Sequence, residues 1–414
     1  MYTEKRVVVT GLGAVTPIGN DVPSFWDSLL AGRSGVAPIT LFDTEGFEVN
    51  FAAEVKGWDG EALFGKKEVR RIDRFVQFAL KAAAEAIKHA GIEKDKEDPW
   101  RCGVYIGAGI GGIATIEEQE GILVNKGPNR VSPLVIPKLI PNMAAGVVSI
   151  EHNFKGPNLC HVSACATGAH AIGEAVHTIL RGDADVMIAG GSEAAVSPLA
   201  VAGFQNMGAL SKRSDAPQKA SRPFEKSRDG FVMGEGAGVL VLESLEHARA
   251  RGANILAEIS GYGLTGDAYH FTAPAPEGEG CARAMMAAIR QAGLSPESVN
   301  YINAHGTSTP LNDVNETQAI KRVFGDHARN LCVSSNKSMI GHLLGAAGSV
   351  EMVATVLSVV NDLVPPTINY EEPDPDCDLD YVPNTAREWK VNVAISNNMG
   401  FGGHNCSILI RKFV

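Results

Sequence analysis

A chain of 414 residues with 45% hydrophobic and 20% charged residues has enough apolar material for a large buried core in one or two domains. Its formal net charge of −10 speaks against a general nucleic-acid-binding protein, and no apolar run approaches the roughly 20 residues that cross a bilayer. The seven cysteines include no C-x-x-C pair, which argues against a disulfide framework and a zinc site. The chain starts with a short, charged segment, which argues against a signal peptide. We therefore expect a cytoplasmic protein.

Short β-branched runs alternate with amphipathic helices in the first part of the chain. Strands that end in glycine-rich turns are predicted at 6–10, 103–106 and 185–189. Apolar side chains at helical spacing predict a helix over 66–90 that stops at Gly91, and a second helix over 166–181. This alternation implies mixed or parallel sheets covered by helices.

A second series of the same kind follows. It comprises predicted strands at 255–259, 298–304, 331–335, 392–396 and 407–411, with a helix at 349–360. The sequence shows no exact internal repeat, but the punctuation fits two successive α/β halves, residues 1–252 and 253–414. No Ser- or Pro-rich linker separates them, so we expect the halves to pack as one unit.

Cys165 stands where a predicted strand meets a helix, in the sequence Val162-Ser-Ala-Cys-Ala-Thr-Gly168. The N–H groups and positive end of a helix favour a thiolate and lower the pKa of a cysteine placed there. The same N–H groups could hold an oxyanion after the sulfur attacks a thioester carbonyl. Most free cysteines are instead buried as small apolar side chains. We assign that role to the other six and predict that Cys165 is a nucleophile.

Two histidines lie among small residues in predicted loops. His305 is found in Asn303-Ala-His-Gly-Thr-Ser-Thr-Pro310, and His342 in Lys337-Ser-Met-Ile-Gly-His-Leu-Leu-Gly345. A histidine in a loop is often only a surface or capping residue, so neither motif decides alone. Together with a cysteine at a helix start, they indicate a nucleophilic site with two imidazoles.

Two glycine-rich segments call for separate interpretations. Gly400-Phe-Gly-Gly403 places one ring among flexible glycines, which suits either a gate at a pocket mouth or a simple turn.

Gly107-Ala-Gly-Ile-Gly-Gly112 matches the G-x-G-x-x-G motif of dinucleotide-binding proteins. Such a site also needs an acidic residue at the end of a second strand, but the following stretch, 114–124, looks like a helix. We therefore do not expect a nicotinamide cofactor.

In order and spacing, these segments resemble the β-ketoacyl-acyl carrier protein synthases of fatty-acid synthesis, most closely the elongating synthase II type. The likeness runs from Val7-Val-Val-Thr-Gly11 to Gly402-Gly-His-Asn405 and includes 220–224, 229–236 and 364–369. The resemblance implies an α/β thiolase-like fold of two similar halves in a five-layered α-β-α-β-α arrangement, usually a homodimer. It also implies an acyltransferase that requires no cofactor and receives acyl and malonyl groups from acyl carrier protein.

The resemblance further implies catalytic roles. The family's Cys-His-His triad falls on Cys165, His305 and His342, with Lys337 ordering the site. The N–H groups of Cys165 and Phe401 would form the oxyanion hole while Cys165 takes the acyl group. Both histidines would then donate hydrogen bonds to the enolate that forms when malonyl loses CO₂.

Substrate contacts are implied at other motif positions. Thr307 and Thr309 would hold the pantetheine amides, Ile110 and Phe204 would line the acyl pocket, and Gly402 would contact substrate. In relatives, the positions of Asn303, Glu351, Ser396 and Asn397 can enclose a structural monovalent cation; no catalytic metal is expected. Asn397-Asn-Met-Gly-Phe401 departs from the common Asn-Ser-Phe-Gly-Phe pattern, and Asn336 stands where threonine is frequent. Chain-length preference and gate behaviour therefore stay open.

Three other functions stay open at this point. A polyketide-pathway ketosynthase would use the same chemistry. A non-catalytic partner subunit would shape chains for another synthase without an acyl group on Cys165. A degradative thiolase would need a second cysteine, for which only Cys406 is near the required end of the chain.

A basic stripe is predicted to dock the acidic carrier protein. Lys67, Arg70, Arg71 and Arg74 recur at helical spacing in the helix predicted from Lys66, opposite its apolar face. The alternative is an ordinary solvated helix face.

Overall fold

The computed structural model describes residues 5–414, so the first four residues of the charged N-terminal segment lie outside it. Ten strands form one continuous sheet in the order β10-β9-β13-β14-β8-β1-β7-β6-β4-β5. Strands of the first half are β1 (Val7–Val15), β4 (Cys102–Gly107), β5 (Asn158–Leu159), β6 (Val186–Glu193) and β7 (Gly236–Ser244). Strands of the second half are β8 (Ala257–Gly266), β9 (Tyr301–Asn303), β10 (Cys332–Ser334), β13 (Val393–Gly400) and β14 (His404–Arg411).

Both halves repeat the same five-stranded pattern. In the first half, β5, β4 and β6 are parallel, and β7 and β1 continue the sheet antiparallel. In the second half, β10, β9 and β13 are parallel, and β14 and β8 continue antiparallel. The halves join where Val7–Val9 of β1 pair with Ala257–Ile259 of β8. Two similar α/β halves are therefore confirmed, and we propose their boundary near Gly252, between α10 (Leu245–Ala250) and β8.

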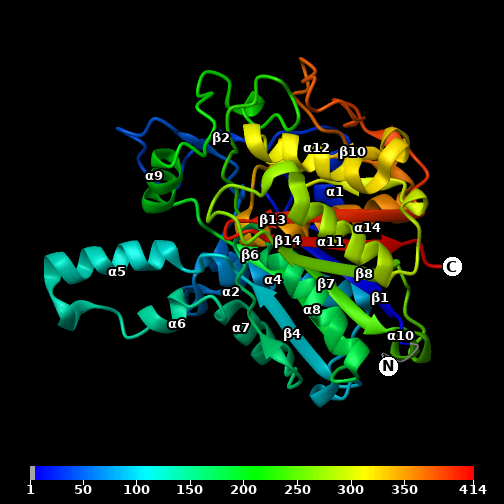
Figure 1. The fold of residues 1–414 in the computed structure, drawn as a ribbon. Coiled ribbons are helices and arrows are strands. Elements are labelled where there is room, and N and C mark those ends of the chain that lie inside the picture. Colours follow the sequence, from blue (N-terminus) through cyan, green and yellow to red (C-terminus); the bar gives the residue numbers. More distant parts are fainter. Residues whose placement is uncertain (1–4) are drawn as a thin grey trace.

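Helices cover both outer faces of the sheet and fill the space between its two halves (Figure 1). In the middle, α8 (Thr167–Arg181) and α14 (Ala347–Asn361) contact each other and strands of both halves. The outer helices are α4 (Arg74–Ala90) and α7 (Met143–His152) on the first half, with α11 (Glu279–Gln291) and α12 (Pro310–Phe324) on the second. This is the predicted α-β-α-β-α arrangement. Further elements are α1 (Val22–Leu30), α2 (Gly60–Phe64), α3 (Lys66–Val69), α5 (Ile113–Lys126), α6 (Val135–Leu139), α9 (Pro198–Asn206), α13 (Lys337–Ile340), β2 (Ala37–Pro38), β3 (Phe51–Ala52), β11 (Leu363–Val364) and β12 (Arg387–Glu388).

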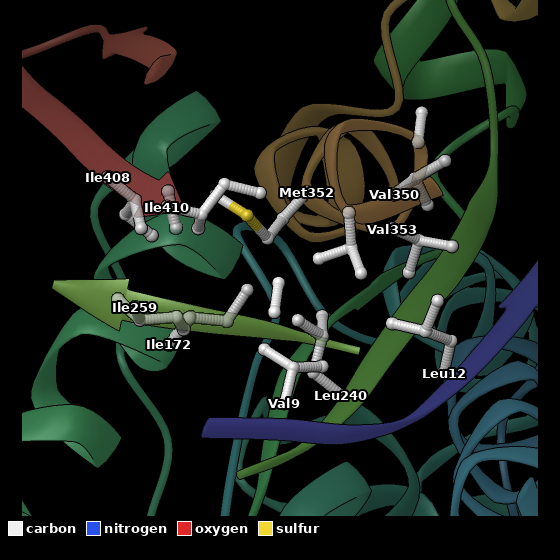
Figure 2. Packing of buried hydrophobic residues seen from close by; sticks show 14 of the residues in the cluster. Val9, Leu12, Ile172, Leu240, Ile259, Val350, Met352, Val353, Ile408 and Ile410 are labelled. Carbon is white, nitrogen blue, oxygen red and sulfur yellow. The ribbon is translucent and has the colours of Figure 1, made fainter. Parts of the chain in front are cut away.

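The core is centred on α14, whose Val350, Met352 and Val353 pack among strands of both halves (Figure 2). The segment Leu344–Asn361 is long and apolar enough by composition to cross a membrane, but 83% of it is buried inside the protein. This corrects the expectation that no apolar run approaches that length. A helix that is apolar on all sides is typical of the centre of a large core.

Glycines in β1 and β8 make the same close contact with a helix in the two halves. The Gly-Leu-Gly segment was expected to end β1, but β1 continues through it to Val15. A Cβ on Gly11 would lie 2.1 Å from the backbone oxygen of Ala86 in α4. A Cβ on Gly261 of β8 would likewise lie 2.1 Å from the backbone oxygen of Ala288 in α11. Glycine is needed at both places because a helix backbone lies directly on the strand.

The helix predicted over 66–90 is interrupted. It consists of α3 and α4, because the side chain of Asp73 accepts a hydrogen bond from the N–H of Phe75 and caps a new helix there. An aspartate at this position stabilises a helix start, so the second helix begins anew. Gly91 ends α4 with a φ of +67°, as predicted.

Candidate active site

The turn before α8 carries Cys165 into a cavity of about 590 Å³. Residues Ala164–Ala166 form a 3-10 turn in which Ala164 has a φ of +49°. Left-handed backbone is costly for an alanine and persists where the surrounding structure holds a functional turn. Gly400 of β13 lies against it, since a Cβ there would be 2.6 Å from the carbonyl oxygen of Ser163. The sequence around Cys165 and the glycine of a distant strand together present the thiol to the cavity.

The pKa of Cys165 differs from the expectation. Burial raises the pKa of the thiol to about 12, and the charge of Lys337 and the N–H groups of Phe401 and Cys165 act in the lowering direction. Because desolvation of the thiolate outweighs these effects, the prediction of a lowered pKa is wrong for the protein without substrate. The N–H groups of Cys165 and Phe401 do lie at the sulfur.

His305 and His342 line the same cavity as Cys165. His305 follows β9 and His342 follows α13, and their ring centroids lie 5.4 Å apart at an interplanar angle of 86°. Burial lowers the pKa of both imidazoles well below their usual value, and the charge of Lys337 lowers it further. Both rings are therefore neutral at physiological pH.

Hydrogen bonds at Nδ1 select one tautomer of each ring. The N–H of Leu344 donates to Nδ1 of His342 at 3.3 Å. Lys337 Nζ lies 3.4 Å from Nδ1 of His305, and an ammonium group can only donate. Since Nδ1 accepts in both rings, the single proton of each neutral imidazole is on Nε2. Each ring can therefore donate one hydrogen bond from Nε2.

Lys337 is buried behind His305, with 1% of its side chain exposed. Its ammonium forms an ion pair with Glu351, whose other carboxylate oxygen accepts a hydrogen bond from Asn398 Nδ2 at 2.6 Å. A buried charge is tolerated only with such partners. Lys337 therefore contacts the Glu351 carboxylate and the His305 ring at the same time.

Glu316 of α12 belongs to the site but was not found from the sequence. Its two carboxylate oxygens accept hydrogen bonds from the N–H groups of His305 at 2.9 Å and Gly306 at 2.8 Å. Burial raises the pKa of Glu316 to about 7. The available signal was a glutamate on the buried face of the helix that follows the His305 loop.

A second unforeseen glutamate explains the Gly107–Gly112 motif. Glu193, at the end of β6, accepts hydrogen bonds from the N–H groups of Gly109, Ile110 and Gly111. The glycine-rich turn therefore binds a carboxylate of its own chain, which agrees with the rejection of a dinucleotide site. An acidic residue at the end of the neighbouring strand was the signal that the sequence offered.

Most of the predicted substrate contacts reach the cavity. Those that line it are Thr307, Thr309, Ile110, Phe204 and Phe401. The hydroxyl oxygens of Thr307 and Thr309 lie 2.9 Å apart. Gly402 lies outside the lining, and its N–H donates to the carbonyl of Phe271 at 2.8 Å. Its φ of +88° is a conformation that glycine adopts readily, which gives the Phe401 loop its tight path.

The side chains considered for a monovalent cation have protein partners. Ser396 Oγ donates to Asn303 Oδ1 at 3.5 Å, and Asn397 Oδ1 accepts from Ser407 at 2.7 Å. Both oxygens of Glu351 are engaged as well. Within residues 5–414, no group of three or more His, Cys, Asp or Glu side chains is arranged to hold a metal ion.

The proposed docking stripe is divided by the helix break. Lys67, Arg70 and Arg71 are exposed on α3 and the turn after it, whereas Arg74 begins α4. Arg74 forms an ion pair of 2.6 Å with the buried Glu235. The four residues therefore do not share one helix face, and the charge of Arg74 is already balanced within the protein.

All seven cysteines are free thiols. Among the described residues, Cys165 is the only one that lines the cavity. Cys406 lies on β14 within the apolar core, and burial raises the pKa of its thiol well above the usual value. The second cysteine that a thiolase needs is therefore not found at this cavity.

Comparisons with known proteins agree with this geometry. The family model of the β-ketoacyl synthase N-terminal domain matches residues 4–248, and that of the C-terminal domain matches 256–371. The chain is 54% identical over 410 residues to a 3-oxoacyl-[acyl-carrier-protein] synthase 2 of Synechocystis sp., covering 99% of both chains. It is 55% identical over 413 residues to the synthase 2 of Staphylococcus aureus, covering 100% of both. Among solved structures, it is similar to a type II polyketide ketosynthase in complex with its acyl-carrier protein (TM-score 0.93, 39% identity, 100% of both chains). A β-ketoacyl synthase from Burkholderia phymatum is similar too (TM-score 0.92, 38% identity, 99% of this chain and 100% of that one).

Proposed function

The chain belongs to the β-ketoacyl synthase family, and on this premise we propose how its residues carry out the reaction. The enzyme is an elongating condensing enzyme of fatty-acid synthesis and an acyltransferase. We propose that its reaction needs no cofactor. It joins an acyl thioester to malonyl-acyl carrier protein and yields 3-oxoacyl-acyl carrier protein, CO₂ and free carrier protein. One observation carries the proposed mechanism: a thiol, two N–H groups and two neutral imidazoles meet at one cavity.

In the first half-reaction, Cys165 takes the acyl group from its carrier. The sulfur attacks the thioester carbonyl, the bond between that carbon and the carrier sulfur breaks, and the thiol proton leaves with the released carrier thiol. The N–H groups of Cys165 and Phe401 hold the oxyanion of the tetrahedral intermediate. Burial makes the thiolate scarce in the free enzyme, so stabilisation of developing charge by these groups and by Lys337 matters most here.

In the second half-reaction, the malonyl thioester loses CO₂. The electron pair of the broken C–C bond passes into an enolate, whose oxygen accepts hydrogen bonds from Nε2–H of His305 and His342. The enolate carbon then attacks the acyl carbonyl on Cys165. The new C–C bond forms as the C–S bond breaks, and the thiolate that is released takes a proton from solvent. Thr307 and Thr309 are placed at the cavity to hold the pantetheine arm.

Acyl carrier protein is the partner, as it is for the polyketide ketosynthase of similar structure. We propose a homodimer as well, because β5 lies at the edge of the sheet and its outer side carries exposed apolar residues. Leu159 is 54% exposed, Val162 58% and Ile150 76%. An unpaired edge with such neighbours is a template for pairing with a second copy. The projecting α5 and α6 lie on the same half of the molecule (Figure 1).

Two further points concern conditions. We propose a cytoplasmic location, which suits a chain with seven free thiols. No step of the mechanism uses a metal cation, since the ammonium group of Lys337 already faces the carboxylate of Glu351. The monovalent cation considered from the resemblance would act on structure alone.

The test follows the two half-reactions in order. Purified enzyme is incubated with acyl-acyl carrier protein, and mass spectrometry of the peptide that contains Cys165 measures whether the acyl group is attached. Malonyl-acyl carrier protein is then added, and a 3-oxoacyl product longer by two carbons is expected together with CO₂. Absence of an acyl group on Cys165 would indicate a non-catalytic partner subunit instead. Cleavage of a 3-oxoacyl chain by coenzyme A, without malonyl turnover, would indicate a thiolase.

A further inference from the structure

The carboxylate of Glu193 connects two segments that are far apart in the sequence. It is fully buried, and its oxygens accept four backbone hydrogen bonds. Three come from the first half of the chain, with lengths of 2.8 Å from Gly109, 3.2 Å from Ile110 and 3.1 Å from Gly111. The fourth comes from Gly345 in the second half at 3.0 Å. Backbone donors of this number match the acceptor sites of one ionised carboxylate.

Close approach of the two segments requires glycine on both sides. A Cβ on Gly109 would lie 2.8 Å from Glu193 Oε2, and a Cβ on Gly345 would lie 2.6 Å from the same oxygen. A Cβ on Gly345 would also come within 2.3 Å of the backbone nitrogen of Gly109. The carboxylate therefore fits between the segments without spare room, and a shift of one segment displaces the other.

Each of the two segments carries a functional residue of the cavity. The Gly109–Gly111 loop holds Ile110, which forms part of the cavity wall next to Cys165. The turn at Gly345 holds Leu344, which lines the cavity and whose N–H donates to Nδ1 of His342. One carboxylate thus contacts both the wall of the acyl pocket and the turn that orients a catalytic imidazole.

We propose that Glu193 is a positioning residue that links the acyl-pocket wall at Ile110 to the orientation of His342, so that acyl-chain selection and malonyl decarboxylation are coupled. The inference rests on the function proposed above for the cavity and for His342. Coupling of this kind needs a shared physical element that both sites contact, and the buried carboxylate is that element. A long acyl chain that moves the Ile110 loop would move the Leu344 turn with it.

Glu193 also acts electrostatically on the nucleophile. Burial raises the pKa of Glu193 to about 7, and above that pH its negative charge acts on the thiol of Cys165 in the direction that raises the pKa of the thiol. Replacement by an uncharged side chain of the same shape should therefore lower the pKa of Cys165. Alkylation of Cys165 then becomes faster at a given pH, because thiolate is the reactive form.

The experiment compares Glu193→Gln with Glu258→Gln. Glu258 is also a buried carboxylate, but it is held by Arg6 and Arg411 at the start of β8, outside the residues that line the cavity. For both variants, kcat/KM is measured over acyl-carrier proteins of graded length, with malonyl decarboxylation and the pH profile of Cys165 alkylation by iodoacetamide. Glu193→Gln turns one acceptor oxygen into an NH₂ group that faces N–H donors. We expect it to reduce the preference between chain lengths, to slow decarboxylation by on the order of 10²-fold, and to shift alkylation to lower pH. Glu258→Gln should leave all three as in the wild type.

A second variant approaches the same contact from the other side. Gly345→Ala crowds Gly109 and Glu193, although Gly345 itself is not part of the cavity lining. A changed chain-length profile in this variant is expected, because the added methyl group meets the backbone nitrogen of Gly109, next to Ile110. If folded Gly345→Ala slows decarboxylation but keeps the wild-type profile, the coupling is refuted. Wild-type length preference and decarboxylation in Glu193→Gln would refute it equally. Failure of the wild-type enzyme to condense at all would instead contradict the proposed function.

Discussion

Two turns occupy corresponding places in the two halves of the molecule, one before α8 and one before α14. Each is a three-residue 3-10 turn, Ala164–Ala166 and Leu344–Ala346, and each leads into a helix of 15 residues. The first residue of each turn has a φ of +49°. The backbone of the nucleophile turn is therefore present twice, and only one copy carries a nucleophile.

The middle residue shows what distinguishes them. Cys165 directs its sulfur into the cavity, whereas at Gly345 a side chain would collide with the backbone of Gly109. The first turn places the thiol in the cavity. In the second turn, the N–H of Leu344 donates to His342 and the N–H of Gly345 donates to Glu193 of the first half. A shared backbone does not give a shared role, because the role depends on whether open space or another segment faces the middle residue.

The largest effect is expected when the thiol is removed from the first turn. Cys165→Ala should abolish condensation, because no thioester can form on a methyl group. Adding Gly345→Cys to it should not restore product, since residue 345 faces the Gly109 backbone and not the cavity. Product analysis by mass spectrometry checks both variants. Malonyl decarboxylation should persist in Cys165→Ala, and condensation by either variant would contradict the assigned nucleophile.

The histidines should rank next. His305→Ala and His342→Ala each remove one hydrogen-bond donor to the enolate, and loss of one such donor commonly costs about 10²–10³ in rate. Decarboxylation and acylation of Cys165 are measured separately, and acylation should be less affected. A variant that decarboxylates at the wild-type rate would show that its histidine has another role.

A matched pair of glycines compares the stability of the two turns. Gly168 and Gly348 occupy the same place after the middle residue of each turn. A Cβ on Gly348 would lie 2.3 Å from Asn398 Oδ1, whereas a Cβ on Gly168 would have 3.0 Å to its nearest neighbours. We expect Gly348→Ala to lower the free energy of unfolding by about 1–3 kcal/mol, as overpacking of a tight core does, and Gly168→Ala to lower it less. Denaturant titration measures both, and the reverse order would mean that the second turn is the looser one.

A smaller effect is expected at the exposed basic residues outside both turns. Charge reversal of Arg70 and Arg71 should raise KM for acyl-carrier substrates a few-fold, and added salt should weaken wild-type binding. Short pantetheine thioesters should react as before, because they need no docking surface. Lys88→Glu, on an exposed part of α4, is the control. Equal losses with both kinds of substrate would mean that the segment supports folding or assembly instead.

The smallest effect on malonyl decarboxylation is expected from a change of pH. The pKa values of His305 and His342 lie well below the usual value, chiefly because of burial, so both rings should stay neutral between about pH 6 and pH 8. Lowering the pH through the usual histidine range should therefore not protonate them, and malonyl decarboxylation should stay nearly constant. A loss of rate with a midpoint near the usual histidine pKa would contradict the neutral pair.

Much of the molecule could be predicted from the sequence alone. Alternating apolar patterns and glycine punctuation predicted two α/β halves, and the small residues around Cys165, His305 and His342 indicated the catalytic set. Local signals suffice for such features, because strand and helix periodicity and turn chemistry depend on neighbouring residues. The break before Asp73 was missed because a continuous apolar pattern hid the start of a second helix.

Other features were decided only by the tertiary structure. Glu193 and Glu316 act on backbone N–H groups, which carry no sequence signature, and Glu193 draws one of its donors from 152 positions further along the chain. The pKa of Cys165 rises instead of falling, because desolvation arises only when distant segments close around the thiol. Gly345 and Cys165 occupy equivalent turns, yet the segment that packs against each decides whether a side chain has space to react. Local sequence determined the turns, and long-range packing determined their use.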